Sequence, residues 1–181
     1  MAATIDVIAE LGFGQASFAR IAERAGLSST RLISYHFAGK DELIVAVVED
    51  VIASIGEYMA RRVGAETSAA WMLRAYIEGM VEFTVAHRAR MKALLEIFLG
   101  GNLHYDATTE RAVGGHVESI LRRGQADGEF RDFDPRVVAT AVQRAVEGLP
   151  FLLESVPDLD CAAYGRELVT LFDLGTRWNG T

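Results

Sequence analysis

The sequence is poor in residues that cross-link small secreted domains and in residues that break helices. Its 181 residues include one cysteine, Cys161, and three prolines. A single cysteine excludes an internal disulfide framework and suits a reducing compartment, so a cytoplasmic location is expected. No apolar run approaches the roughly 20 residues that a membrane-spanning helix needs, so no membrane partner is expected. Because hydrophobic residues make up 50% of the chain, it can still bury a sizeable core.

Positive charge is also scarce. The 18 Lys and Arg residues face 25 Asp and Glu residues, which gives a formal net charge of −7. Because attraction to phosphates supplies most non-specific nucleic-acid affinity, this balance alone argues against nucleic-acid binding. A DNA-binding function would have to rest on local geometry and on a few well-placed basic groups.

Sequence motifs for catalysis and metal binding are missing as well. The sequence has no GxSxG motif and no phosphate-binding P-loop. None of its four histidines stands at HxxxH or HExxH spacing, which argues against a zinc site. We therefore expect no metal, no cofactor and no enzymatic activity.

What the sequence does have is helical periodicity along nearly its whole length. Few segments resemble strands, so the predicted fold is all-α, with about nine helices. Gly12 is expected to end the first helix. Asp134-Pro135 should begin a late helix, as a cap followed by proline at the first helical position. Pro150 should end or kink that helix.

The segment after the first helix has the pattern of a helix-turn-helix. Ser17 is a good N-cap for a short helix whose apolar face includes Ala22. Gly26 follows where a left-handed residue would close the turn at little cost. A second short helix would come next, with Leu32 packing back against the first. Taken alone, this spacing is equally compatible with an ordinary helical hairpin.

The second helix of this pattern would carry the DNA-contacting groups. Ser28 or Ser29 can cap it, and its outer face would expose short hydrogen-bonding side chains around one arginine. Such a surface can enter a major groove and contact base edges and phosphates, although Ser and Thr are also common on any solvated helix. The predicted DNA-binding residues are Ser17, Ser28, Ser29, Thr30, Arg31, Ser34, Tyr35, His36 and Lys40.

A longer signature surrounds this pattern and resembles the DNA-binding domain of the tetracycline-repressor (TetR) family. In that family the helix-turn-helix runs into a His-Phe pair, a short turn and a Lys-acidic-acidic-Leu sequence that opens a long fourth helix. The resemblance covers about residues 3–47. Its matching elements are Ser17, Ile21-Ala22, Ala25-Gly26-Leu27-Ser28, His36-Phe37 and Lys40-Asp41-Glu42-Leu43.

Two features depart from the family pattern. The family usually has eight residues between the turn glycine and the His-Phe pair, whereas Leu27–Tyr35 make nine. Counted from the glycine, the family's threonine and tyrosine near the end of the recognition helix fall on Arg31 and Ile33. Counted from the histidine, they fall on Leu32 and Ser34. A further alternative is a helix one residue longer, which would bring Tyr35 to the phosphates instead. The family's basic N-terminal arm is also missing, so the natural start is expected to lie upstream.

The resemblance implies a division into two domains. A helix-turn-helix DNA-binding head would span residues 1–45, and a helical ligand-binding and dimerisation body would span residues 46–181. A long helix from Lys40 to about Val63 would join them directly. The implied partners are a palindromic double-stranded DNA operator, a small hydrophobic effector and a second copy of the chain.

Two sets of body residues are assigned to these partners. Aromatic residues and methionines line apolar pockets, although each alone is more often plain core. The predicted effector-binding residues are Trp71, Tyr76, Met80, Phe83, Phe98, His104 and Phe151. Apolar stripes on the last two helices predict a two-fold four-helix interface, with monomer core as the alternative. The predicted interface residues are Val138, Ala141, Val142, Ala145, Leu149, Leu168, Leu171 and Phe172.

The favoured hypothesis is a ligand-responsive repressor that a small hydrophobic effector releases from its operator. One alternative is a helical ligand-binding dimer without useful DNA affinity. The other is an enzyme on an all-helical scaffold, which no catalytic motif supports. The sequence does not fix the effector, the operator, or whether the ligand weakens or strengthens DNA binding.

Overall fold

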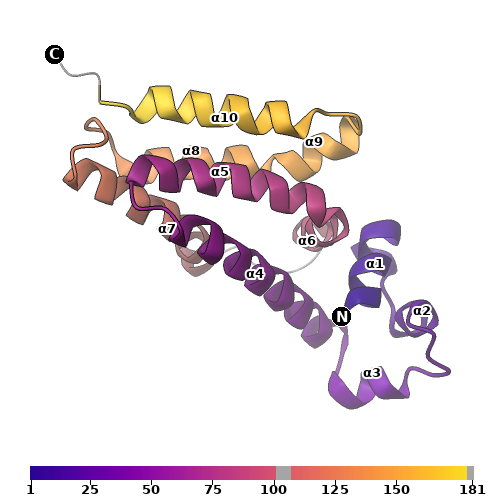
Figure 1. Cartoon of the computed structure of the whole chain (residues 1–181). Helices are drawn as coiled ribbons and strands as arrows, with labels where there is room; N and C mark the ends of the chain where they lie inside the picture. Colours follow the sequence, from indigo (N-terminus) through magenta and orange to yellow (C-terminus); the bar gives the residue numbers. More distant parts are fainter. Residues whose placement is uncertain (101–106, 179–181) are drawn as a thin grey trace. The chain divides into compact units, whose positions relative to one another are not determined.

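The computed structural model describes residues 1–100 and 107–178, and within them it contains helices and no strand (Figure 1). The predicted all-α class is confirmed. No helix in this described part is long and apolar enough to cross a membrane. The elements are α1 (Ala2–Leu11), the 3-10 turn η1 (Phe13–Gln15), α2 (Phe18–Arg24), α3 (Arg31–His36), α4 (Lys40–Gly64), α5 (Ala69–Ala86), α6 (Arg88–Gly100), α7 (Ala107–Ala126), α8 (Pro135–Glu147), α9 (Leu149–Ser155) and α10 (Cys161–Thr176).

The chain divides into two compact units. The first contains Met1–Ile55 and His87–His104, and the second contains Gly56–Ala86 and Tyr105–Thr181. Helix α6 therefore groups with the N-terminal helices, which differs from the division at residue 45 that the resemblance implies. Helix α6 groups with these helices because it packs against α1, and its Ala93 and Ile97 side chains are fully buried in the same hydrophobic core.

Two glycines end the first helices of this unit as predicted. Gly12 has φ of +85° and closes α1, and Gly26 has φ of +68° after α2. At the second turn, the Leu27 N–H donates to the Ala22 carbonyl at 2.8 Å and the Gly26 N–H to the Glu23 carbonyl at 3.0 Å. A residue with a Cβ would be strained at these positive φ angles. Gly26 therefore allows the tight turn by which the chain leaves α2 and runs on to α3.

Helix α4 runs without interruption and contributes residues to both units. At its start, the Glu42 carboxylate accepts a hydrogen bond from the Ala38 N–H at 2.6 Å. Val51 is fully buried in the core of the first unit. In the second unit, the Tyr58 hydroxyl donates to Glu82 of α5 at 2.9 Å. The long helix predicted from Lys40 is confirmed and ends within one residue of its expected end.

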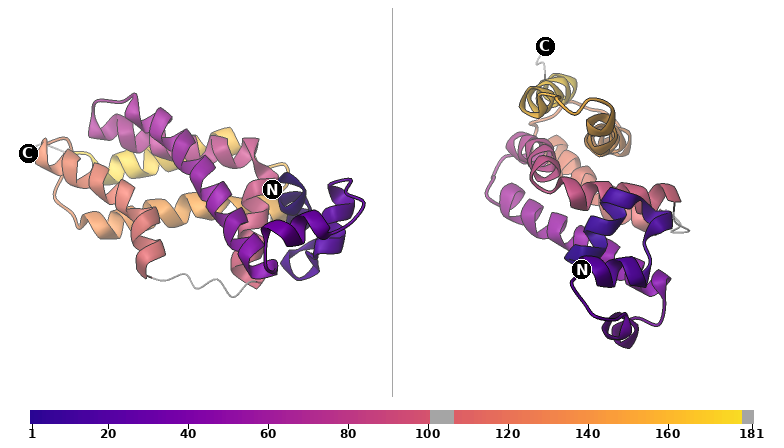
Figure 2. Two further views of the ribbon diagram at one scale, coloured as in Figure 1. Left: turned by 90° about the horizontal axis from the view of Figure 1, so that it is seen from below. Right: turned by 90° about the vertical axis from the view of Figure 1, so that its right-hand side faces the viewer.

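Helix α5 is the helix against which most of the second unit packs. It contacts α7, α8, α9 and α10, and α10 lies alongside it (Figures 1 and 2). Helix α8 begins as predicted, because the Asp134 carboxylate accepts hydrogen bonds from the Arg136 and Val137 N–H groups. It ends at Glu147, and Pro150 lies in the first turn of α9, so the expected break near this proline is confirmed.

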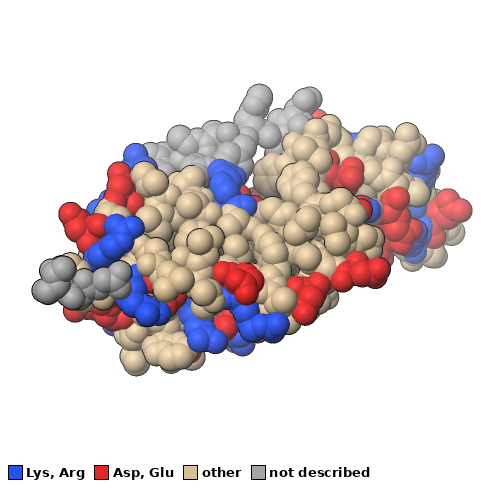
Figure 3. Space-filling model, turned by 90° about the horizontal axis from the view of Figure 1, so that it is seen from above, with Lys and Arg blue, Asp and Glu red and all other residues tan. Residues whose placement is uncertain are grey.

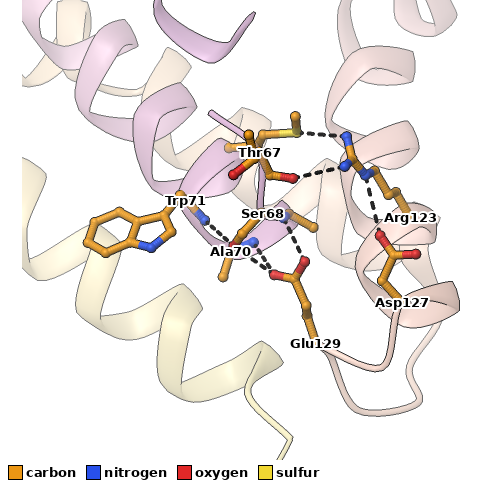
Figure 4. A network of polar contacts seen from close by, with 9 residues as sticks. Thr67, Ser68, Ala70, Trp71, Arg123, Asp127 and Glu129 are labelled. Atoms are coloured by element: carbon orange, nitrogen blue, oxygen red, sulfur yellow. Dashed lines mark hydrogen bonds and ion pairs between the residues drawn. The ribbon is translucent and has the colours of Figure 1, made fainter. Parts of the chain in front are cut away.

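The loop between α7 and α8 caps two other helices. The Glu129 carboxylate accepts hydrogen bonds from the Ser68 hydroxyl at 2.8 Å and from the next two backbone N–H groups at 3.0 Å, at the start of α5 (Figure 4). Two residues later, Arg131 Nε donates to the Gly175 carbonyl at 2.8 Å, near the end of α10. An acid at a helix N-terminus and a base at a C-terminus both oppose the helix dipole, so this one loop stabilises both ends.

The substitution Glu129→Gln is expected to lower the free energy of unfolding by about 1 to 3 kcal/mol at neutral pH, because the amide loses the charge that three donors share. Asp127→Asn is the matched control. Asp127 is exposed and pairs with Arg123 at 3.4 Å, so this change should cost about 0.5 kcal/mol or less. Urea denaturation measures both, and equal losses for the two variants would contradict the capping role.

The same contact predicts a pH dependence. Burial raises the pKa of the Glu129 carboxyl, but the hydrogen bonds at the start of α5 and the nearby Arg123 outweigh burial and hold the pKa below its ordinary 4.5. Such a group contributes stability that is fully present above its unfolded pKa and is lost as the pH falls through its folded pKa. The stability gap between the unmutated chain and Glu129→Gln should therefore stay constant near neutral pH and shrink below pH 4.5.

Candidate functional site

Helix α3 is a short helix with one buried side chain. Ile33 is 9% exposed and belongs to the core of the first unit. Leu32 is 54% exposed and Tyr35 is 83% exposed. The expectation that Leu32 packs back is therefore wrong by one residue. The spacing misled because a helix of six residues is too short for periodicity to identify its inner face.

The burial of Ile33 also bears on the register of α3. A buried side chain cannot contact DNA, so the count from the glycine, which puts the family's tyrosine on Ile33, does not fit. The count from the histidine puts it on Ser34, which is exposed. The extra residue then falls in the connection Ala25–Thr30, between the end of α2 and the start of α3.

The predicted DNA-binding residues other than Lys40 occupy three places in the first unit. Ser17 caps α2, with its hydroxyl oxygen accepting from the Arg20 N–H at 3.4 Å. Ser28, Ser29 and Thr30 precede α3, and Thr30 occupies the N-cap position that was predicted for Ser28 or Ser29. The Ser29 hydroxyl oxygen accepts a hydrogen bond from the Arg31 N–H at 3.4 Å. The members that lie on α3 are all exposed, and they are Arg31, Ser34, Tyr35 and His36.

Most basic side chains of this region make contacts within the unit. Arg24 pairs with Glu10 through two hydrogen bonds, and these lower the pKa of the Glu10 carboxyl. Arg20 donates to the Gln15 side chain at 2.6 Å. Within the fully described segment 1–43, Arg31 is the basic residue whose side chain has no hydrogen bond, ion pair or ring contact. Its guanidinium is therefore available to a partner.

Lys40 has a structural contact that the sequence did not predict. Its Nζ donates to the Phe13 carbonyl at 2.8 Å and lies 4.2 Å from the centroid of the Phe13 ring. These contacts hold the start of α4 against η1. A phosphate contact by Lys40 stays a prediction, but the ammonium already has two partners inside the unit.

The predicted effector-binding residues differ in burial and in the unit to which they belong. Tyr76, Met80 and Phe83 are buried in the second unit, at 5%, 5% and 2% exposure. Phe98 belongs to the first unit, and Phe151 is exposed on α9. A further member, His104, lies outside the described residues.

Tyr76, one of these buried aromatics, takes part in a chain of polar contacts with α8. The Tyr76 hydroxyl donates to Gln143 Oε1 at 2.5 Å, and Gln143 Nε2 donates to Glu147 Oε1 at 2.7 Å. Burial raises the pKa of the Tyr76 phenol, which therefore stays neutral and can act as a donor. Sequence reasoning missed Gln143. A signal was present, because this polar residue stands between Ala139 and Val146 at the helical spacing of the buried face of α8.

Trp71, another of the predicted effector-binding residues, is 55% exposed. The Arg74 guanidinium lies 5.1 Å from its ring centroid. Two cavities of about 400 and 450 Å³ open beside this tryptophan. The first is mainly apolar and lies between α5 and α10, with Leu73, Ile77, Phe130, Val169 and Phe172 among its lining residues. The second is more polar, with Arg61, Arg62, Glu66 and Glu78 among its lining residues.

The predicted interface residues fall into three groups, which are buried, exposed and half-buried. Val142 and Leu149 are fully buried within the single chain, so they are corrected to monomer core and are not available to a partner. Ala141 and Leu171 are exposed. Val137, which the sequence did not single out, is 64% exposed on α8, four residues before Ala141. The remaining four are half-buried, and they are Val138, Ala145, Leu168 and Phe172.

Metal binding finds no support in the described residues. Among the described side chains, those of residues 1–100 and 115–178, no group of three or more His, Cys, Asp or Glu is placed to hold a metal ion. Cys161 is half-buried, and its thiol contacts the Leu159 carbonyl at 3.5 Å.

Comparisons with known proteins agree on one family. A model described as bacterial regulatory proteins, tetR family, matches residues 1–47. The HTH-type transcriptional regulator BetI of Cronobacter sakazakii is 32% identical over 158 residues, which cover 85% of this chain and 73% of that protein. BetI of Escherichia coli strain K12 is 35% identical over 156 residues, which cover 85% of this chain and 76% of that protein.

The fold agrees with these sequence matches. A bacterial regulatory protein in the tetR family from Rhodococcus RHA1 has a TM-score of 0.78, at 20% identity, over 94% of this chain and 90% of that one. The relatives that match in sequence are regulators of transcription and not enzymes, as expected from the lack of catalytic motifs. Together, the identity and coverage of the matches establish that the chain belongs to the TetR family of bacterial transcriptional regulators.

Proposed function

We propose that this regulator is a repressor that binds a palindromic operator as a dimer and is released by a small hydrophobic effector. The observation that carries the DNA-binding part is the outer face of α3, where Arg31 has no partner within its unit and the neighbouring Ser34 and Tyr35 are exposed. In a dimer, two such helices enter successive major grooves, about 34 Å apart.

The acidic composition is compatible with this proposal. The guanidinium groups of Arg20 and Arg24 are hydrogen-bonded to side chains within the head. The guanidinium group of Arg31 has no such contact and is exposed. A helix that places one arginine and several hydroxyl groups against DNA gains specificity from base edges, which does not depend on the net charge of the whole chain. We therefore expect modest affinity for random DNA and a clear preference for one sequence.

The substitution Arg31→Ala tests the DNA-binding part, with a duplex selected from a random pool. If Arg31 reads a guanine, affinity should fall by about 1 to 3 kcal/mol per half-site, with a larger loss on the selected duplex than on random DNA. Arg88→Ala is the matched control, because Arg88 is exposed on α6 of the same unit and its removal changes the net charge equally. Fluorescence anisotropy gives both affinities.

The outcomes separate the candidate functions. An equal loss on every sequence would make Arg31 a phosphate contact, and no loss would remove it from the interface. If the unmutated chain enriches no sequence from the pool, the alternative of a ligand-binding dimer without useful DNA affinity takes the place of the repressor.

The dimer part of the proposal rests on exposed apolar side chains of α8 and α10. Val137 and Ala141 of α8 and Leu171 of α10 are exposed, and Leu171 is 62% exposed. The surface over α10 is largely uncharged, with most charged groups at its margins (Figure 3). The Tyr164 hydroxyl donates to the Ala145 carbonyl at 2.8 Å, which holds the two helices together at one end. Exposed apolar side chains on a largely uncharged surface support an interface between copies at this place.

The substitution Leu171→Glu is expected to convert dimers to monomers. A two-fold interface would bury two carboxylates, at a cost on the order of 3 kcal/mol or more. The variant should still fold, because Leu171 is exposed in the single chain. Ala162→Glu is the control, since this exposed residue lies nine positions earlier on α10 and so on the opposite side of the helix. Sedimentation equilibrium that gives a dimer for Leu171→Glu would contradict this interface.

The effector part rests on the cavity between α5 and α10. Its volume of about 400 Å³ lies in the usual range for small-ligand sites, and its lining is mainly apolar with Arg74 and Asp173 at its wall. Helix α4 offers a route to the head, because it is continuous through both units and Tyr58 joins it to α5 through Glu82. An effector that favours a different position of α4 would change the spacing of the two heads on DNA.

Anilinonaphthalene sulfonate, which fluoresces in apolar sites, is a suitable probe for this cavity. The substitution Trp71→Ala should weaken its binding by roughly tenfold, because the site loses a large apolar wall. Phe151→Ala is the matched control, because this aromatic residue is also exposed but does not line either cavity beside Trp71. A saturating probe should also lower operator affinity by roughly 5- to 150-fold. Binding that leaves operator affinity unchanged would contradict the coupling.

A further inference from the structure

Leu32 is an exposed apolar side chain in the middle of a polar surface. It is 54% exposed, and its neighbours on α3 that also face outward are Arg31, Ser34, Tyr35 and His36. A single exposed leucine is ordinary on a protein surface. Helix α3, however, has six residues and buries only Ile33. Leu32 is therefore a substantial part of the surface that this helix can present to a partner.

Helical geometry places the exposed residues of α3 at different angles around its axis, and His36 lies on the same flank as Leu32. Successive residues of an α-helix are rotated by about 100°, so Arg31 and Tyr35 lie near the middle of the face opposite Ile33. Leu32 and Ser34 then lie on opposite flanks of that middle line. The helix therefore presents an arginine with an apolar neighbour on one side and a hydroxyl on the other.

The chemistry of the major groove limits what an apolar flank can contact there. Thymine presents a C5-methyl group in that groove, whereas cytosine carries only a hydrogen at C5, and adenine and guanine present polar groups along that edge. A leucine packed on one of those polar edges would remove water from a donor or acceptor without replacing its hydrogen bond. A leucine packed on the methyl group removes apolar surface of both partners from water.

We propose that Leu32 is a specificity-determining residue that packs on the C5-methyl group of a thymine in each half-site of the operator. This proposal rests on the proposed function, because it requires α3 to enter the major groove. The thymine lies next to the base pair that Arg31 contacts, because Leu32 follows Arg31 on the same outer face. The operator of this chain is therefore selected by one polar and one apolar contact from adjacent residues.

Replacing thymine by deoxyuridine in the selected duplex tests this contact without changing the protein. The exchange removes the methyl group and keeps every hydrogen-bonding group of the base. At one thymine per half-site, the affinity of the unmutated chain should fall roughly fourfold when one half-site is changed and roughly 15-fold when both are changed. These factors correspond to the loss of one buried methyl group from each contact. Thymines elsewhere in the duplex should tolerate the exchange.

The variant Leu32→Ala completes the test. It should bind the thymine duplex more weakly than the unmutated chain and should bind the thymine and deoxyuridine duplexes equally, within about twofold. Ser34→Ala is the matched control on the opposite flank of α3, and it should keep the preference for thymine. Circular dichroism should give both variants the helix content of the unmutated chain, because both side chains are exposed.

Two results would overturn the proposal. One is equal affinity of the unmutated chain for duplexes with thymine and deoxyuridine at every position. The other is a thymine preference that survives in Leu32→Ala. Failure of the proposed function has a different signature, since the unmutated chain would then select no duplex at all, and the proposal for Leu32 would fall with it.

Discussion

The burial of Ile33 is the constraint on which the functional account depends. This one side chain is the part of α3 that enters the core of the first unit, alongside residues of α1, α2, α4 and α6. Because α3 has a single inward side chain, its burial fixes the rotation of the whole helix. The rotation in turn determines that Arg31 and Leu32 face outward, and it favours a register in which the extra residue lies before the helix.

The second unit depends on contacts that come from distant parts of the sequence. Helix α5 is packed on several sides, and its start is capped by Glu129, which lies about 60 residues further along the chain. The same loop holds the end of α10 through Arg131. These caps stand at the end of the unit where Trp71 and Phe130 line the apolar cavity. The hydrogen bonds of Glu129 and Arg131 therefore fix helix ends that stand beside the proposed effector site.

Features that depend on local chemistry were predictable from the sequence. The structure confirms the glycines that end α1 and α2, the start of α8 at Asp134-Pro135 and the break near Pro150. Each of these features depends on only a few neighbouring residues, so the sequence was enough to predict it. Packing partners were not predictable in the same way. An apolar stripe on α8 does not say whether Val142 faces its own chain or another copy. Periodicity likewise cannot place Trp71, because a helix with apolar residues on several sides has no single inner face.

Amide hydrogen exchange, followed with and without the selected duplex, tests most directly the claim that the outer face of α3 is the DNA-binding surface. The account predicts that DNA protects the backbone of residues 28–37, while α10 exchanges at an unchanged rate. Protection confined to other helices, with residues 28–37 exchanging as fast in the complex as in the free chain, would contradict the account.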